Sequence, residues 1–135
     1  MNFVFEQEGR PHQLAELRRR PVMLVLMRTS EIVSQIYMKE ITGVFEKRAG
    51  KLRILVLTVE PTEAPFVDMY ARSEDLPFFI GVAEESVLLG ASSLGVIPAI
   101  PMTYLIDAGG RVVYTRPGVI PEDELVSEID ELLDF

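Results

Sequence analysis

The segment "IPMTYLIDAGGRVVYTRPG", residues 100–118, contains two β-rich runs joined by the short turn sequence "DAGG". Two such runs around a glycine-rich turn are typical of a β-hairpin. Because an aspartate at the start of a turn commonly accepts hydrogen bonds from the backbone that follows it, we expect Asp107 to stabilise the turn. The segment therefore predicts two antiparallel strands late in the chain.

Two further apolar runs precede this hairpin. The runs "VMLVLM" (Val22–Met27) and "LRILVLTV" (residues 52–59) are uninterrupted and of strand length, which is typical of strands covered on both faces. Between them, apolar residues recur at steps of three and four from Ser30 to about Arg48, which predicts a helix that stops near Gly50. The apolar residues that carry this spacing are Ile32, Val33, Ile36, Tyr37, Ile41, Val44 and Phe45.

The remaining segments carry weaker patterns. Residues 2–7 predict an edge strand, which a turn at residues 9–11 separates from about two helical turns in residues 12–20. Later segments predict a short helix from about Thr62 to before Pro77, a strand at 78–83, a helix at 84–94 and a terminal amphipathic helix after Pro121. Because strands separated by helices imply right-handed parallel crossovers, the sequence predicts a single α/β domain over residues 1–135. We expect a mixed central β-sheet with helices on both faces, a C-terminal hairpin and a closing helix.

The composition limits the chemistry. The chain has no cysteine, so it cannot form a disulfide, a thiolate nucleophile or a zinc–thiolate site. With His12 as the one histidine, a metal site would depend on carboxylates, and we predict neither a metal nor a cofactor. A net charge of −8 argues against nucleic-acid binding, which needs a continuous cationic surface. Bases are concentrated between Arg10 and Arg53 and acids after Pro121, which we interpret as two solvated surfaces of opposite sign.

The first residues are polar and charged, so we expect neither a signal peptide nor a membrane span in the chain as given. That pattern fits a cytoplasmic protein, and an extracytoplasmic location would require that a signal or anchor segment had been removed. The absence of cysteine favours neither compartment.

Three segments together resemble the TlpA-like branch of the thioredoxin-like superfamily, which consists of thiol–disulfide oxidoreductases. Residues 9–27, "GRPHQLAELRRRPVMLVLM", resemble the lead-in to that branch's first central strand. Residues 100–118 resemble its hairpin, in which the proline is cis, and "PEDELVSEIDELL" resembles its closing helix. The resemblance covers nearly the whole chain and implies a thioredoxin-like fold. It makes Pro101 the cis-proline and Ile100 the residue whose backbone faces the active site.

The same resemblance locates the family's redox couple. Alignment of "VMLVLMRTSEIVSQ" with the family's strand-to-helix junction places Glu31 and Ser34 on the two cysteine positions. A carboxylate near a helix N-terminus is stabilised by the helix dipole, so Glu31 has a structural explanation that needs no catalytic role. Thr29 or Ser30 is suited to cap the helix. Ser34 has no histidine nearby to activate it, and we expect it in an exposed or half-buried second turn.

The junction would then be a redox site without its redox couple. The absence of cysteine excludes dithiol–disulfide exchange, so we expect a redox-inactive protein that binds rather than catalyses. In thioredoxin-like proteins the backbone beside the cis-proline pairs with an extended peptide, which predicts polypeptide binding at an apolar cleft flanked by Met27. The alternative is thiol-independent catalysis, with Glu31 as acid or base; a raised pKa of Glu31 and a water-poor pocket would favour it. The expected binding residues are Thr29, Ser30, Glu31, Ile100, Pro101 and Met102.

Overall fold

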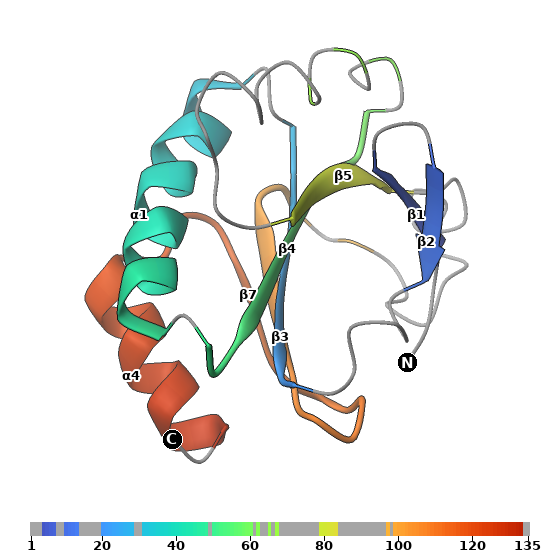
Figure 1. Cartoon of the computed structure of the whole chain (residues 1–135). Helices are drawn as coiled ribbons and strands as arrows, with labels where there is room; N and C mark the ends of the chain where they lie inside the picture. The colour runs from blue at the N-terminus through green and yellow to red at the C-terminus, as the bar shows by residue number, and fades with distance from the viewer. Residues whose placement is uncertain are drawn as a thin grey trace.

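Seven strands pair into one sheet in the order β2-β1-β5-β4-β3-β6-β7 (Figure 1). The computed structural model describes residues 4–7, 10–13, 20–28, 31–48, 50–60, 62, 65, 67, 79–83, 97 and 99–133. The described elements are β1 (Val4–Gln7), β2 (Arg10–Gln13), β3 (Val22–Met27), α1 (Ile32–Arg48), β4 (Arg53–Thr58), β5 (Phe79–Ala83), β6 (Met102–Ile106), β7 (Val112–Pro117) and α4 (Glu122–Leu132).

The centre of the sheet is mixed, as predicted. Strand β3 pairs in parallel with β4 and antiparallel with β6, and β4 pairs in parallel with β5. Every side chain of β3 is buried, which explains why its residues are all apolar and do not alternate between apolar and polar. Alternate residues of β3 point to opposite faces, so Met23 and Val25 enter one core and Leu24 and Leu26 enter the other.

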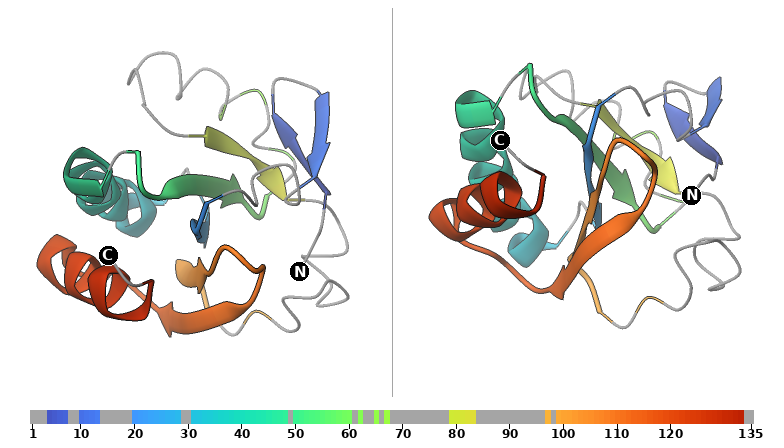
Figure 2. Two further views of the ribbon diagram at one scale, coloured as in Figure 1. Left: turned by 60° about the horizontal axis from the view of Figure 1, so that its bottom comes forward. Right: turned by 90° about the horizontal axis from the view of Figure 1, so that it is seen from below.

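Helices α1 and α4 pack against the same face of the sheet and against each other (Figures 1 and 2). The bounds of α1 agree with the prediction, and the chain turns after it at Gly50, which has a positive φ of 86°. Helix α4 follows Pro121 and buries Leu125 and Ile129, as its amphipathic pattern predicts. The helix predicted at residues 84–94, and most of the one predicted between Thr62 and Pro77, lie outside the described residues.

The buried side of α1 differs from the one that its apolar residues suggest. The three most exposed large apolar side chains in the described chain are Ile32, Val33 and Ile36, at 73%, 47% and 51% exposure. Steps of three and four residues fit more than one side of a helix, and docking on the sheet selects which side is covered. The residues that α1 buries are Ser34, Tyr37, Met38, Ile41 and Val44.

The prediction for the N-terminal region is partly wrong. His12 and Gln13 belong to strand β2 rather than to a helix, and the rest of that predicted helix lies outside the described residues. Arg10 and Pro11, predicted as a turn, also lie in β2. Antiparallel pairing with β1 supplies backbone hydrogen bonds that outweigh local helix preference. The edge strand on this side is therefore β2 and not β1, and an edge strand tolerates Pro11.

The late hairpin forms around the predicted turn. Strands β6 and β7 pair antiparallel with an irregularity after Leu105. The carboxylate of Asp107 accepts a hydrogen bond from the backbone N–H of Arg111 at 2.9 Å, and its carbonyl accepts one from Gly110 at 2.9 Å. This confirms the predicted role of Asp107. Strand β7 is the second edge of the sheet.

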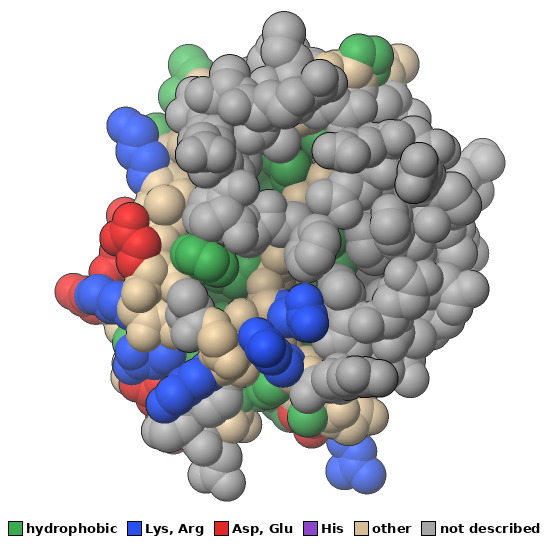
Figure 3. Space-filling model, viewed as in Figure 1, with side chains coloured by type: hydrophobic (Ala, Val, Ile, Leu, Met, Phe, Trp, Pro, Cys, Tyr) green, Lys and Arg blue, Asp and Glu red, His purple; other side chains and the backbone are tan. Residues whose placement is uncertain are grey.

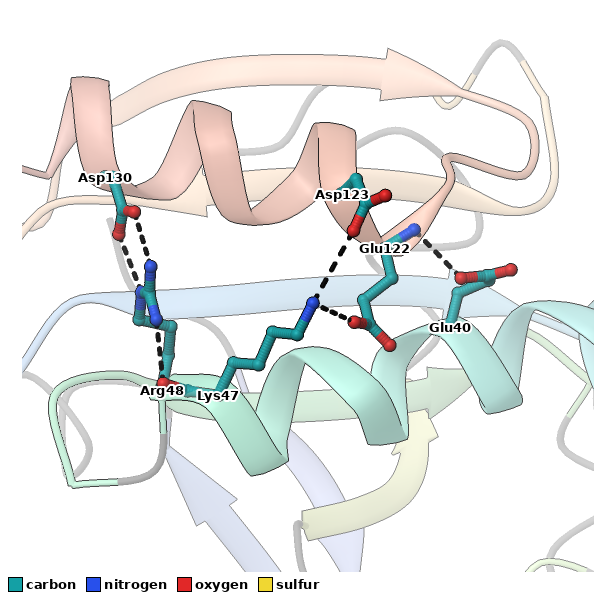
Figure 4. Close-up of polar contacts among 6 residues, drawn as sticks. All are labelled: Glu40, Lys47, Arg48, Glu122, Asp123 and Asp130. Carbon is teal, nitrogen blue, oxygen red and sulfur yellow. Dashed lines mark hydrogen bonds and ion pairs between the residues drawn. The ribbon is translucent and has the colours of Figure 1, made fainter.

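Acidic side chains of α4 meet basic side chains of α1 (Figure 4). Arg48 donates to Asp130, with Nε 2.7 Å from Oδ1, and Lys47 pairs with Glu122 and Asp123. In the face shown in Figure 3, basic side chains gather over the lower half, where α1 ends and β4 begins. The prediction of two separate solvated surfaces is therefore wrong at this helix interface, because the two helices bring opposite charges together.

Candidate functional site

Four chain segments converge at one end of the central strands of the sheet. Leu26 at the end of β3 pairs with Met102 at the start of β6, so the Ile100–Pro101 peptide bond lies just beyond that pair. Strand β4 ends at the same end of the sheet, where the N–H of Val59 donates to the carbonyl of Met27 at 2.9 Å. Helix α1 begins a few residues after Met27. Open α/β sheets commonly bind ligands at the carboxyl ends of their parallel strands, which is the position of this end of the sheet.

The segment around Pro101 forms one half of the site. The Ile100–Pro101 peptide bond is cis, the isomer that the resemblance implies. Pro101 and Met102 are buried, and the carbonyl of Pro101 accepts a hydrogen bond from Gly118 at 2.8 Å. Ile100 is half-buried and packs against both cores. Within the described part of the chain, the backbone N–H and C=O of Ile100 make no hydrogen bond.

Ser34, which the sequence resemblance aligns with the family's second cysteine, is fully buried. The expectation of an exposed or half-buried serine is wrong, because Ser34 lies on the side of α1 that also buries Tyr37 and Met38. Its hydroxyl accepts a hydrogen bond from the backbone N–H of Arg28 at 3.2 Å. Ser34 therefore satisfies a backbone donor that follows the last residue of β3, which is a structural role.

Glu31, which the sequence resemblance aligns with the family's first cysteine, directly precedes α1. Its carbonyl accepts the first bond of the helix, from Gln35 at 3.1 Å, and its N–H donates to the carbonyl of Arg28 at 3.0 Å. The Glu31 side chain is 46% exposed, and its Oε1 lies 3.6 Å from Nη1 of Arg28. Thr29 and Ser30, predicted as capping and binding residues, lie outside the described residues.

Arg28 links Glu31 to the end of β4. Its Nε donates to Oε1 of Glu60 at 2.9 Å, a much shorter contact than the one with Glu31. The hydrogen bond to Glu60, and then the charges of both carboxylates, raise the pKa of Arg28. All three side chains are between 41% and 46% exposed. The result is an exposed cation between two carboxylates at the rim of the site.

A buried hydrogen bond joins the two halves of the site. The hydroxyl of Tyr37 on α1 lies 2.6 Å from the hydroxyl of Thr103 on β6. Burial raises the pKa of Tyr37, while the bond to Thr103 lowers it by a smaller amount. Sequence reasoning missed this pair, because Tyr37 fits the apolar spacing of the helix and its partner is 66 residues away.

Apolar side chains lie exposed on the outer side of the first two turns of α1. We call Ile32, Val33 and Ile36 the apolar patch. Hydrophobic side chains are visible at the upper left of Figure 3, over the N-terminal end of α1. The site therefore offers apolar contact, two carboxylates and backbone groups of Ile100. Glu31 is open to solvent.

Among the described residues, no three histidine or carboxylate side chains gather so that they could hold a metal ion. Nor does any helix in the described ranges have the length and apolar character needed to span a membrane.

No protein-family model matches the sequence, and no curated protein matches it either. Solved structures match along nearly the whole chain. A secreted thiol-disulfide isomerase from Corynebacterium glutamicum has a TM-score of 0.82 and 15% identity over 100% of this chain and 84% of that chain. A putative protein disulfide isomerase from Bacteroides thetaiotaomicron has a TM-score of 0.75 and 22% identity, covering 100% and 87%.

An exposed lipoprotein thioredoxin from Streptococcus pneumoniae has a TM-score of 0.72 and 20% identity, covering 98% of this chain and 100% of that chain. At these sequence identities the structural similarity establishes the fold and does not establish an activity. The chain therefore adopts the thioredoxin-like fold of these proteins, without a cysteine anywhere in its sequence.

Proposed function

We propose that this chain is a redox-inactive thioredoxin-like domain that binds an extended polypeptide segment at the end of the sheet where β3 ends and β6 begins. The observation that carries the proposal is the backbone of Ile100. Its N–H and C=O form no hydrogen bond within the described ranges, and its side chain is half-buried beside Pro101. An extended peptide that pairs with these groups gains main-chain hydrogen bonds, which supply affinity in strand-type recognition.

The residues at the cysteine positions support binding rather than thiol chemistry. Ser34 is buried and its hydroxyl is bonded to the backbone of Arg28, so it is not available to a substrate. Glu31 is exposed and paired with Arg28, so it lacks the desolvated surroundings that make a carboxylate an effective acid or base. These two features favour binding over the catalytic alternative.

The experiment is peptide selection followed by NMR. A random-peptide phage library is selected on the full chain, and the enriched peptides are titrated into ¹⁵N-labelled protein, with scrambled peptides as controls. We expect the amide signals of Glu31, Ile100 and Met102 to shift and hydrogen exchange at Ile100 to slow. Shifts confined to β7 or α4, or selected peptides that bind no better than their scrambled forms, would contradict the proposal.

A further inference from the structure

We propose that the bound segment carries an apolar side chain next to a lysine or arginine. The apolar side chain packs on the apolar patch, Ile32, Val33 and Ile36, and the basic side chain pairs with Glu31. This inference rests on the proposed function and names the chemistry of the segment that the site selects.

The patch is unusual among the apolar side chains of the described chain. Ile32 and Ile36 lie four residues apart and Val33 lies three before Ile36, so all three share one side of α1. Their exposures of 47% to 73% exceed those of the other exposed large apolar side chains, which are 36% to 37%. Those other residues are Val112, Val113, Val119 and Leu132.

The charges beside the patch favour a basic partner. Glu31 and Glu60 together carry two negative charges against the single positive charge of Arg28, which leaves a net charge of −1. Arg28 lies 2.9 Å from Glu60 but 3.6 Å from Glu31, so Glu31 is the carboxylate with the weaker partner. Glu31 also directly precedes Ile32 in the chain, and both side chains are exposed, so the carboxylate and the patch belong to one short solvent-facing segment. The net charge of −8 attracts a basic segment at longer range.

A short segment fits this surface better than a second copy of the chain. Each copy carries a net charge of −8, so two copies repel each other. Three side chains also offer far less than the roughly 800 Å² per partner that a stable protein interface buries. A peptide that pairs with Ile100 needs only a small anchoring contact in addition to its backbone hydrogen bonds.

The test uses four synthetic host peptides that differ only at two adjacent central positions: leucine–lysine, leucine–glutamate, serine–lysine and serine–glutamate. Dissociation constants are measured by NMR titration of the full chain. We expect the leucine–lysine peptide to bind tightest. Ile32→Ser should weaken its binding about fivefold or more, the size of loss typical of an anchoring contact. Glu31→Gln should weaken it about two- to fivefold, because an exposed ion pair contributes little.

Two further variants test whether the peptide preference depends on Glu31 and on the apolar patch. Glu31→Lys should reverse the preference from the leucine–lysine to the leucine–glutamate peptide, which a merely structural role of Glu31 would not produce. Val113→Ser, a matched change of an exposed apolar residue on β7, should leave all four affinities unchanged. Equal losses in Ile32→Ser and Val113→Ser would overturn the inference, as would unchanged preference in Glu31→Lys.

The failures of the two proposals can be told apart. If the four peptides bind equally while hydrogen exchange at Ile100 slows, peptide binding at this end of the sheet stands and the apolar–basic preference is wrong. If none of the four peptides binds and library-selected peptides leave Ile100 unaffected, both proposals are wrong.

Discussion

The hydroxyl of Tyr37 lies 2.6 Å from the hydroxyl of Thr103, and both residues are fully buried. Tyr37 stands three residues after Ser34 on α1, and Thr103 stands two residues after Pro101 on β6. The bond therefore joins the helix that carries one half of the candidate site to the strand that carries the other. Because a buried hydroxyl without a partner is costly, this bond holds the two halves in one relative position.

Removal of one partner should destabilise the fold. Tyr37→Phe leaves the hydroxyl of Thr103 without this partner, and we expect a loss of about 1–3 kcal/mol in the free energy of unfolding. Thr103→Val should cost a similar amount. The double variant should lose less than the sum of the two, because neither unpaired hydroxyl remains. Urea unfolding measures all three, and strictly additive losses would show that the two hydroxyls do not interact.

Stability should fall at alkaline pH partly through Tyr37. Burial raises its pKa above the value of about 10 that tyrosine has in an unfolded chain. A raised folded-state pKa contributes stability below about pH 10, and that contribution is lost as the pH rises through the folded value. The difference in urea midpoint between the wild type and Tyr37→Phe should therefore stay constant up to about pH 10 and shrink as the pH rises further. Tyr104, whose pKa burial also raises, is present in both proteins and cancels.

The α1–α4 contact should weaken in acid. The hydrogen bond from Arg48 lowers the pKa of Asp130, so its contribution to stability is present above about pH 4 and lost as the pH falls through the lowered value. Asp130→Asn should lower the urea midpoint at neutral pH, and the difference from wild type should vanish in strong acid. Glu131→Gln, the adjacent exposed position on α4, is the matched control and should leave the midpoint unchanged at both pH values.

Cysteines placed at the two aligned positions should form a disulfide. In Glu31→Cys/Ser34→Cys the thiols are three residues apart, a separation at which side chains at the start of a helix face each other. We expect oxidised glutathione to convert them to an intramolecular disulfide, detected by mass spectrometry after alkylation. Glu31→Cys/Val33→Cys is the control, because residues two apart do not face each other. Equal disulfide formation in both variants would contradict the assignment of positions 31 and 34.

Local sequence patterns were sufficient to predict those elements whose conformation depends on one dominant interaction. The uninterrupted apolar runs of β3 and β4 predict strands because both faces of each strand are covered. The turn at Asp107 could be predicted because its stabilising hydrogen bonds come from residues within the turn itself. In contrast, β2 could not be predicted, since its strand conformation depends on pairing with β1 rather than on its own residues.

The candidate site likewise combines features that the sequence predicts with features that depend on tertiary contacts. By itself the sequence established the absence of cysteine and, through its resemblance to known motifs, singled out Glu31, Ser34 and Pro101 as candidates for the site. Only the tertiary structure decided that Ser34 is buried, that Tyr37 bonds Thr103, and that Ile32 and Ile36 are left outside. The physical reason is that helical spacing specifies a period, whereas the side of the helix that is covered depends on how it docks on strands distant in the sequence.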